Sequence, residues 1–219
     1  VLAAMFLYLT RIEKLIIENS TIHNNQGYGI HATNCKVSIY NSQITNTLND
    51  CIAIIGGETY INHCTIAQFY PFDGNRGAAF SFANNKNGTA YPITACTIRN
   101  SIVTGYAEDV VMAYISDTIN SEFKFDHCML RTPEISDTLR CSNIIWENTT
   151  DTIATGHKNF QLIDSEKLKY DFRLTEKSKA VNTADATTSL PLDRNATPRD
   201  TKPDMGCYEY VATASEEKE

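Results

Sequence analysis

The chain has 219 residues, with 19 lysines and arginines against 26 aspartates and glutamates, and a formal net charge of −7. This length can bury a hydrophobic core as one domain. No apolar run of about 18 residues occurs, which excludes a bundle of transmembrane helices. The acidic balance and the scattered basic residues argue against nucleic acid as a partner. Abundant Asn, Thr and Ile favour many short strands joined by tight turns, and disfavour a helix bundle.

The chain begins with an apolar segment, VLAAMFLYL, at residues 1–9. No positively charged residue precedes it and no small-residue cleavage site follows, so it matches a secretory signal peptide poorly. Taken alone, the segment is compatible with a capping helix or with a strand.

A repeat of 22 residues follows this segment. The segment IENSTIHN begins at Ile17, IYNSQITN at Ile39 and INHCTIAQ at Ile61, and two further copies begin at Ile98 and Phe125 after longer connections. Apolar and polar residues alternate within each copy, as in a half-buried strand. The copies predict three apolar columns: Ile17, Ile39, Ile61, Ile98 and Phe125; Ile22, Ile44, Ile66, Val103 and Leu130; and Leu15, Val37, Thr59, Cys96 and Phe123.

A polar pair lies between the first two columns in every copy. The alternation changes phase at this pair, which predicts a corner, and Asn suits a corner because it tolerates the left-handed backbone conformation. We expect His63 and His127 to be hydrogen-bonded corner residues and not functional groups. The five pairs are Asn19 and Ser20, Asn41 and Ser42, His63 and Cys64, Asn100 and Ser101, and His127 and Cys128.

A further strand is expected about ten residues after each corner, around Ile30, Ile52, Phe80 and Val110. Three short strands in each repeat predict the coils of an all-β, single-stranded parallel β-helix, a solenoid in which stacked coils bury continuous columns. A leucine-rich repeat has a similar length, but it requires Leu where these columns hold Ile. Tyr8 lies one period before Ile30, so we expect residues 1–9 to be a strand of an earlier coil. Residues 1–148 would then be the C-terminal part of a longer helix.

The last third of the chain contains SNIIWEN at residues 142–148, NFQLIDSEKLKYDFRLTEKSKAVNTAD from residue 159, and LDRNATPRDTKPDMGCYEY ending at residue 210. It resembles the choice-of-anchor-type ending of secreted bacterial β-helix proteins. Lys179, Asn182 and Cys207 depart from the usual Pro, Asp and Ala of that ending. With the repeat, the whole chain resembles the right-handed parallel β-helix, pectate-lyase-like superfamily.

The resemblance implies a right-handed helix, an extracellular or outer-surface location on a bacterium, and polysaccharide as partner, but it supplies no catalytic motif. It also implies an irregular C-terminal cap at residues 149–211, followed by a disordered tail at 212–219. Three prolines in the cap should stop further strand pairing. Residues 205–210 are expected to cover the apolar edge of the last coil.

An insertion lengthens the connection from Ile61 to Ile98 and falls in two loops, residues 68–77 and 83–92. Long loops on a rigid scaffold often carry binding residues. Their aromatic side chains could stack on sugar rings, or could fold inward to close the loop over the core; the sequence leaves both open. The candidates in these loops are Phe69, Tyr70, Phe72, Asp73, Arg76 and Tyr91.

In enzymes of the superfamily the substrate lies along the outer face of one parallel sheet, here the strands around Ile30, Ile52, Phe80 and Val110. The candidates on this face are His31, Ser81 and Asp109. No cluster of carboxylates suited to calcium and no pair suited to glycoside cleavage is visible, so no cofactor is expected. The seven cysteines are unevenly spaced and are expected to be buried thiols without disulfides.

Three functions remain open from the sequence. A non-catalytic polysaccharide-binding module, expected to be a monomer, fits this chain best. A lyase-like or glycoside-cleaving enzyme would need catalytic residues upstream or in the loop at 68–77. A structural surface spacer or adhesin would need no binding groove.

Overall fold

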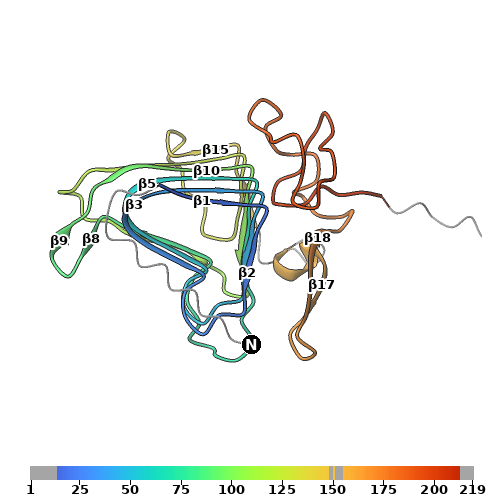
Figure 1. Cartoon of the computed structure of the whole chain (residues 1–219), viewed down its shortest axis with the longest axis horizontal. Coiled ribbons are helices and arrows are strands. Elements are labelled where there is room, and N and C mark those ends of the chain that lie inside the picture. The colour runs from blue at the N-terminus through green and yellow to red at the C-terminus, as the bar shows by residue number, and fades with distance from the viewer. Residues whose placement is uncertain (1–13, 148–149, 151–154, 213–219) are drawn as a thin grey trace, which may run out of the picture.

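The computed structural model describes residues 14–147, 150 and 155–212, and within these the chain is almost entirely strand and turn. Two sheets built from parallel pairs dominate. The first contains β1 (Lys14–Glu18), β3 (Ile30–Tyr40), β5 (Ile52–Asn62), β7 (Phe80–Ala83), β10 (Ile93–Arg99), β12 (Val111–Tyr114), β13 (Ser121–Asp126) and β15 (Cys141–Ser142). The second contains β2 (Thr21–His23), β4 (Gln43–Thr45), β6 (Thr65–Gln68), β11 (Ile102–Gly105), β14 (Met129–Leu130) and β16 (Ile145–Trp146). Figure 1 shows successive strands of each sheet stacked behind one another along the view.

The apolar columns predicted from the repeat are confirmed by the strand pairing. Ile17 pairs with Ile39, Ile39 with Ile61, Ile61 with Ile98, and Ile98 with Phe125. The columns that begin at Ile22 and at Leu15 are in register in the same way. Because each column lies in the buried core, every coil shields the apolar side chains of its neighbours. The architecture is all-β and consistent with a β-solenoid.

The corner residues also have the predicted conformation. Their φ angles lie between 43° and 51°, the left-handed region, at Asn19, Asn41, His63, Asn100 and His127. The backbone N–H of each corner donates to a carbonyl of the next coil; that of Asn41, for example, lies 3.2 Å from the Asn62 oxygen. This ladder explains why His can replace Asn there: the backbone makes the bond, and the residue only has to tolerate positive φ.

One register differs from the prediction by a residue. Phe80 pairs with Val111 and not with Val110, although Val110 is buried. The carbonyl of Val110 accepts hydrogen bonds from both Ala79 and Phe80, at 3.0 and 3.1 Å. This doubled bond is a local irregularity of the ladder, and the repeat pattern does not encode it.

The cysteine prediction holds. All seven cysteines are free and buried, and Cys64 and Cys128 lie in the core. Burial raises the pKa of the Cys51 and Cys128 thiols to about 12, so these groups stay protonated and act as small apolar side chains.

The C-terminal residues lie along the side of the stack, which differs from the expected position over the edge of the last coil. The antiparallel hairpin of β17 (Phe160–Asp164) and β18 (Lys169–Leu174) follows η1 (Gly156–Asn159), a short 3-10 helix, and stands beside the second sheet (Figure 1). Phe160 and Phe172 form a second core with side chains of that sheet, Ala67, Ile102 and Met129.

The segment at residues 205–210 continues along the same side. The N–H of Gly206 donates to the Asn100 carbonyl, 2.8 Å away, and that of Cys207 donates to the Thr65 hydroxyl, 3.2 Å away. Outward apolar residues on β6, β11 and β14 explain this course, since they would otherwise face water.

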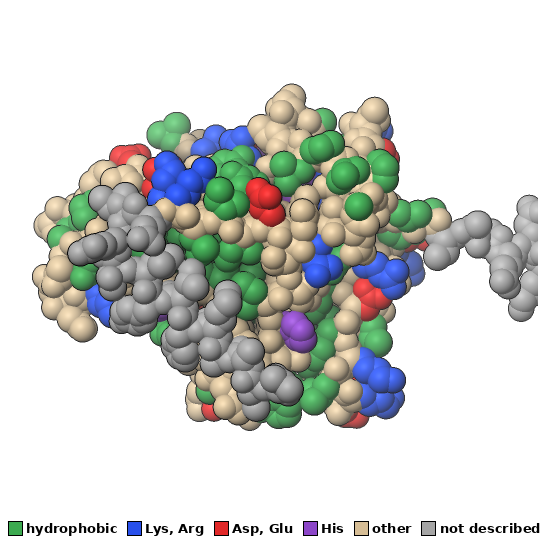
Figure 2. All heavy atoms as spheres, in the orientation of Figure 1, with side chains coloured by type: hydrophobic (Ala, Val, Ile, Leu, Met, Phe, Trp, Pro, Cys, Tyr) green, Lys and Arg blue, Asp and Glu red, His purple; other side chains and the backbone are tan. Residues whose placement is uncertain are grey.

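On the face shown in Figure 2, acidic and basic side chains are interspersed.

Candidate functional site

The insertion at residues 68–77 directs its first two aromatic rings inward. Phe69 is fully buried and packs against Tyr106, Phe160 and Phe172, with ring centroids 4.9 to 6.2 Å apart. Tyr70 is 7% exposed. Neither ring offers a face to a ligand. Of the two possibilities that the sequence left open, these two residues follow the one in which the aromatic side chains fold inward over the core. Phe69 joins the coils to the C-terminal hairpin.

Phe72 is the exposed aromatic residue of this loop, at 68% exposure. Its ring packs edge-on against Tyr70, 5.4 Å away. Arg76 donates to the carbonyls of Tyr70 and Asp73, and its guanidinium lies 5.1 Å from the Tyr106 ring centroid. Asp73 accepts the N–H of Asn75. Arg76 and Asp73 therefore hold the loop in shape.

On the outer face predicted to bind substrate, His31 on β3 and Ser81 on β7 lie on the two strands that flank β5. Both pair with Ala53, from either side. The Ser81 hydroxyl donates to Asp50 at 2.5 Å, and the other oxygen of Asp50 accepts the N–H of Ala78 at 2.8 Å. Burial and the charge of Lys86 lower the pKa of His31, while Asp50 opposes this. Ser81 is buried and its hydroxyl is hydrogen-bonded to Asp50. Because Asp50 also accepts the N–H of Ala78, its role is to hold the start of β7 in place.

Tyr91 and Asp109 make local contacts. The N–H of Tyr91 donates to Asn84 beside the small hairpin of β8 (Asn85–Lys86) and β9 (Thr89–Ala90). The carboxylate of Asp109 accepts the N–H of Val111, 3.2 Å away, at the start of β12. The predicted residues thus fall into separate groups, one in the loop at 68–77 and another beside Asp50.

A different outer face carries a row of aromatic and charged side chains. Tyr40 on β3 and Tyr60 on β5 place their rings 5.7 Å apart. Arg99 on β10 lies 3.5 Å from the carboxylate of Asp126 on β13. Burial raises the pKa of Tyr60, and the nearby Arg99 opposes this rise. Tyr40 is in register with Asn62 and Tyr60 with Ser38, so the two rings belong to neighbouring outward columns, and both columns follow the stack.

The C-terminal segment forms a wall beside this row. Asn41 donates to the carbonyl of Leu192 at 2.8 Å, and Asn62 donates to that of Thr188 at 2.9 Å. Between the wall and the sheet lies a groove of about 620 Å³, within the size range of ligand pockets. Its lining includes Lys14, Ile16, Glu18 and Tyr40 from the sheet, and Leu190, Pro191, Leu192 and Arg194 from the wall.

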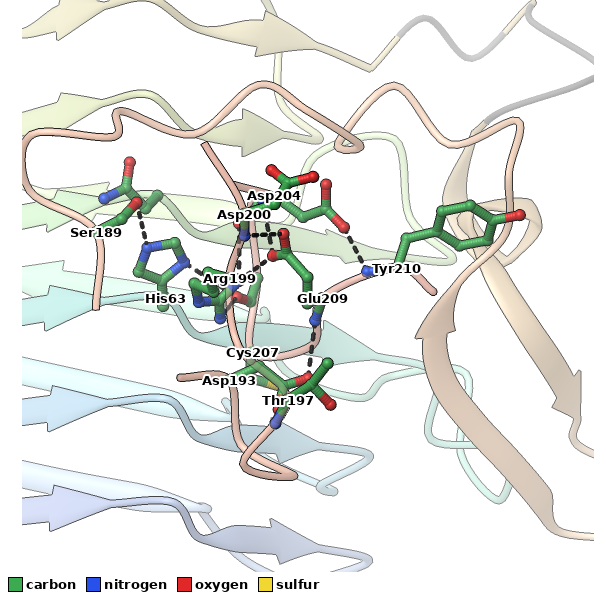
Figure 3. Close-up of polar contacts among 12 residues, drawn as sticks. His63, Ser189, Asp193, Thr197, Arg199, Asp200, Asp204, Cys207, Glu209 and Tyr210 are labelled. Atoms are coloured by element: carbon green, nitrogen blue, oxygen red, sulfur yellow. Dashed lines mark hydrogen bonds and ion pairs between the residues drawn. The ribbon is translucent and has the colours of Figure 1, made fainter. Parts of the chain in front are cut away.

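A buried cluster of charges holds the wall in place (Figure 3). Arg199 forms an ion pair with Glu209 at 2.9 Å and also donates to the carbonyls of Asp204 and Gly206. The carboxylate of Asp204 accepts the N–H groups of Asn182 and Tyr210. Burial raises the pKa of Asp204 to about 6. Most of the polar atoms of the cluster bond to one another or to the backbone of the same segment, so its role is to position the groove.

Asp193 and His63 attach the two ends of this segment. Asp193 accepts the N–H groups of Asn195, Thr197 and Glu209 at 2.7 to 2.9 Å. His63 lies 2.9 Å from the Ser189 hydroxyl and 3.3 Å from the Gly206 carbonyl. Burial lowers the pKa of His63 to about 3, so the ring is neutral at pH 7. The prediction that His63 is a hydrogen-bonded corner residue is confirmed.

Sequence reasoning missed Tyr40 and Tyr60. A signal was available, because each is adjacent in sequence to an Ile of the first apolar column and must therefore point outward. What the sequence could not provide was the wall, whose contacts to the coils span up to 174 residues along the chain.

A scan against protein-family models found no match for this chain, and a search of curated proteins found none either. Among the residues that the structure describes, no group of three or more His, Cys, Asp or Glu side chains is arranged to hold a metal ion. No helix in the described part of the chain is long and apolar enough to span a membrane.

Proposed function

We propose that this chain is part of a secreted or surface-exposed bacterial protein that binds polysaccharide without cleaving it, as a monomer. We further propose that its stack is a single-stranded, right-handed parallel β-helix of the pectate-lyase-like type with coils of about 22 residues. The location and the class of helix rest on the resemblance of the repeat and of the ending at residues 142–210.

One observation carries the binding proposal: the rings of Tyr40 and Tyr60 lie side by side on an outer sheet face, 5.7 Å apart and tilted by 47°, and Tyr40 lines an open groove. Tyrosine offers a rigid apolar ring at low entropic cost, with a hydroxyl that can bond to a polar ligand. The apolar face of a sugar ring can pack on Tyr40 and Tyr60. Its hydroxyl groups can bond to Lys14 and Glu18 at the groove.

The geometry of the stack favours a polymer over a small molecule. The groove runs between a sheet face and a wall anchored at successive coils, through Asn41 and Asn62. Both signs of charge line it, with Lys14 and Arg194 against Glu18 and Asp193. We expect binding without a metal ion, and hence binding that persists in a chelator.

Isothermal titration against a panel of soluble bacterial and plant polysaccharides tests this proposal. The variant Tyr40→Ala with Tyr60→Ala should weaken binding at least about fivefold, because two stacking surfaces of roughly 0.5–1.5 kcal/mol each are removed. Tyr114→Ala, which changes a tyrosine of β12 that is 61% exposed, is the matched control and should bind like the parent.

The same samples discriminate the other functions. Unsaturated products or shortened chains after incubation would indicate an enzyme and contradict the non-catalytic proposal. No binding to any polysaccharide by the folded protein would favour a spacer or adhesin.

A further inference from the structure

A second hollow, of about 310 Å³, lies between the C-terminal hairpin and the outer face of β2 and β4. It is separate from the groove at Tyr40, because it opens on the second sheet, and the two share no lining residue. We call it the hairpin cleft. Its volume is at the lower end of the range for ligand sites, which suits one or two rings and not a long chain.

One wall of the hairpin cleft is aromatic. Tyr170 and Phe172 on β18 are stacked with ring centroids 6.2 Å apart and planes 10° from parallel. Tyr208 closes the inner end and donates its hydroxyl to the Gln43 side chain at 2.8 Å. Leu168, at the hairpin turn, is 48% exposed and completes the apolar side. This wall is held rigidly by the second core, to which Phe172 belongs.

The opposite wall consists of hydroxyl and amide groups. Thr21 and Thr45 lie on adjacent strands, and Gln43 donates to the Thr45 oxygen at 3.3 Å. His23 and Asn24 are exposed at the mouth. None of the described residues lining the hairpin cleft is Asp, Glu, Lys or Arg. A ligand with a formal charge would find no opposite charge here, whereas a ring with several hydroxyl groups would find both donors and acceptors.

We propose that the hairpin cleft binds a single neutral sugar unit, with one ring face against Tyr170 and its hydroxyl groups toward Thr21, His23 and Asn24. The choice of a sugar rests on the proposed polysaccharide function, while the site itself is independent of the groove. A ligand of about twelve non-hydrogen atoms in a shallow site should bind with a Kd on the order of 1 mM.

Saturation-transfer NMR at pH 7.5 with the methyl glycosides of glucose, galactose and mannose tests the proposal, with methyl galacturonide as the charged comparison. At least one neutral glycoside should receive saturation and titrate in the millimolar range. Tyr170→Ala should weaken this binding at least about fivefold. Thr21→Val keeps the shape of an exposed side chain on β2, and should weaken binding about threefold in a protein that folds normally.

The variants also separate this proposal from that for the groove. Tyr40→Ala with Tyr60→Ala should leave glycoside binding unchanged, and Tyr170→Ala should leave polysaccharide binding in the groove unchanged. The proposal is overturned if no neutral glycoside binds, if the galacturonide binds equally well, or if both Tyr170→Ala and Thr21→Val bind like the parent. Loss of glycoside binding in the groove variant alone would place the sugar in the groove and also overturn it.

Discussion

The guanidinium of Arg199 lies 2.9 Å from the carboxylate of Glu209, and the two side chains are only 2% and 6% exposed. This ion pair is the centre of the buried cluster that holds the C-terminal segment against the coils. A buried pair of this kind adds little net stability in itself, but removing one partner leaves the other charge uncompensated. The position of the groove wall therefore depends on both residues.

Arg199→Ala should lower the free energy of unfolding by about 3–5 kcal/mol, because Glu209 would be left buried without a partner. Urea denaturation measures the change. The exposed pair of Lys36 and Glu58, 2.6 Å apart, is the matched control, and Glu58→Gln should cost less than about 1 kcal/mol. An equally small loss for Arg199→Ala would show that the cluster does not hold the wall.

The ring of His63 should make the protein sensitive to acid. Its folded pKa of about 3 lies below the ordinary 6.5, so the unfolded chain takes up the proton first. Stability is therefore full above about pH 6.5 and falls as the pH drops toward 3, by at most about 1.4 kcal/mol per pH unit. His63→Asn keeps a residue that tolerates positive φ and should flatten this dependence in urea titrations between pH 7 and pH 4.

Asp204 acts in the opposite direction and provides the internal check. Its folded pKa of about 6 lies above the ordinary 3.8, so the folded chain takes up this proton first, and its contribution to stability grows as the pH falls from 6 toward 3.8. Asp204→Asn should consequently steepen the acid loss that His63→Asn flattens. Identical pH profiles for the two variants would contradict both assignments.

The apolar columns should behave as a close-packed core. Ile61 is fully buried between Ile39 and Ile98, so Ile61→Ala should cost about 2–5 kcal/mol of unfolding free energy. Ile16, on the outer face of β1 and 49% exposed, is the control; Ile16→Ala should change stability by about 0.5 kcal/mol or less. A cost at Ile61 as small as that at Ile16 would mean that the register is wrong.

Phe69 and Phe72 lie three positions apart in one loop, and their replacement by Ala should change the stability of the protein by very different amounts. Phe69→Ala removes a ring that joins the coils to the hairpin and should cost about 3–5 kcal/mol. Phe72→Ala should stay within about 0.5 kcal/mol, since its ring is largely in water. Thermal unfolding of both variants checks this contrast, and equal melting temperatures for the two variants would contradict it.

The inward-facing residues and the corners of the coils could be predicted from the sequence, because they depend on residues that are close together along the chain. The alternation around Ile17, Ile39 and Ile61 determines which side chains face inward, and a polar residue able to adopt positive φ marks each corner. A shift of one residue would turn every Ile outward, so the pattern leaves one register. The pairing departs from that rule after the insertion, at Ile93 and at Val110 and Val111.

The amino-acid sequence by itself determined the inner columns, the corners and the free cysteines, since each follows from a period repeated within short stretches. The tertiary structure decided which outer surfaces are open. Phe69 is buried in the second core and Tyr40 lines the groove, because residues 188–208 and the hairpin fold back along the side of the stack. That placement depends on contacts between residues far apart in the chain, such as Phe69 with Phe160 and Tyr208 with Gln43, and no local pattern of apolar and polar residues encodes it.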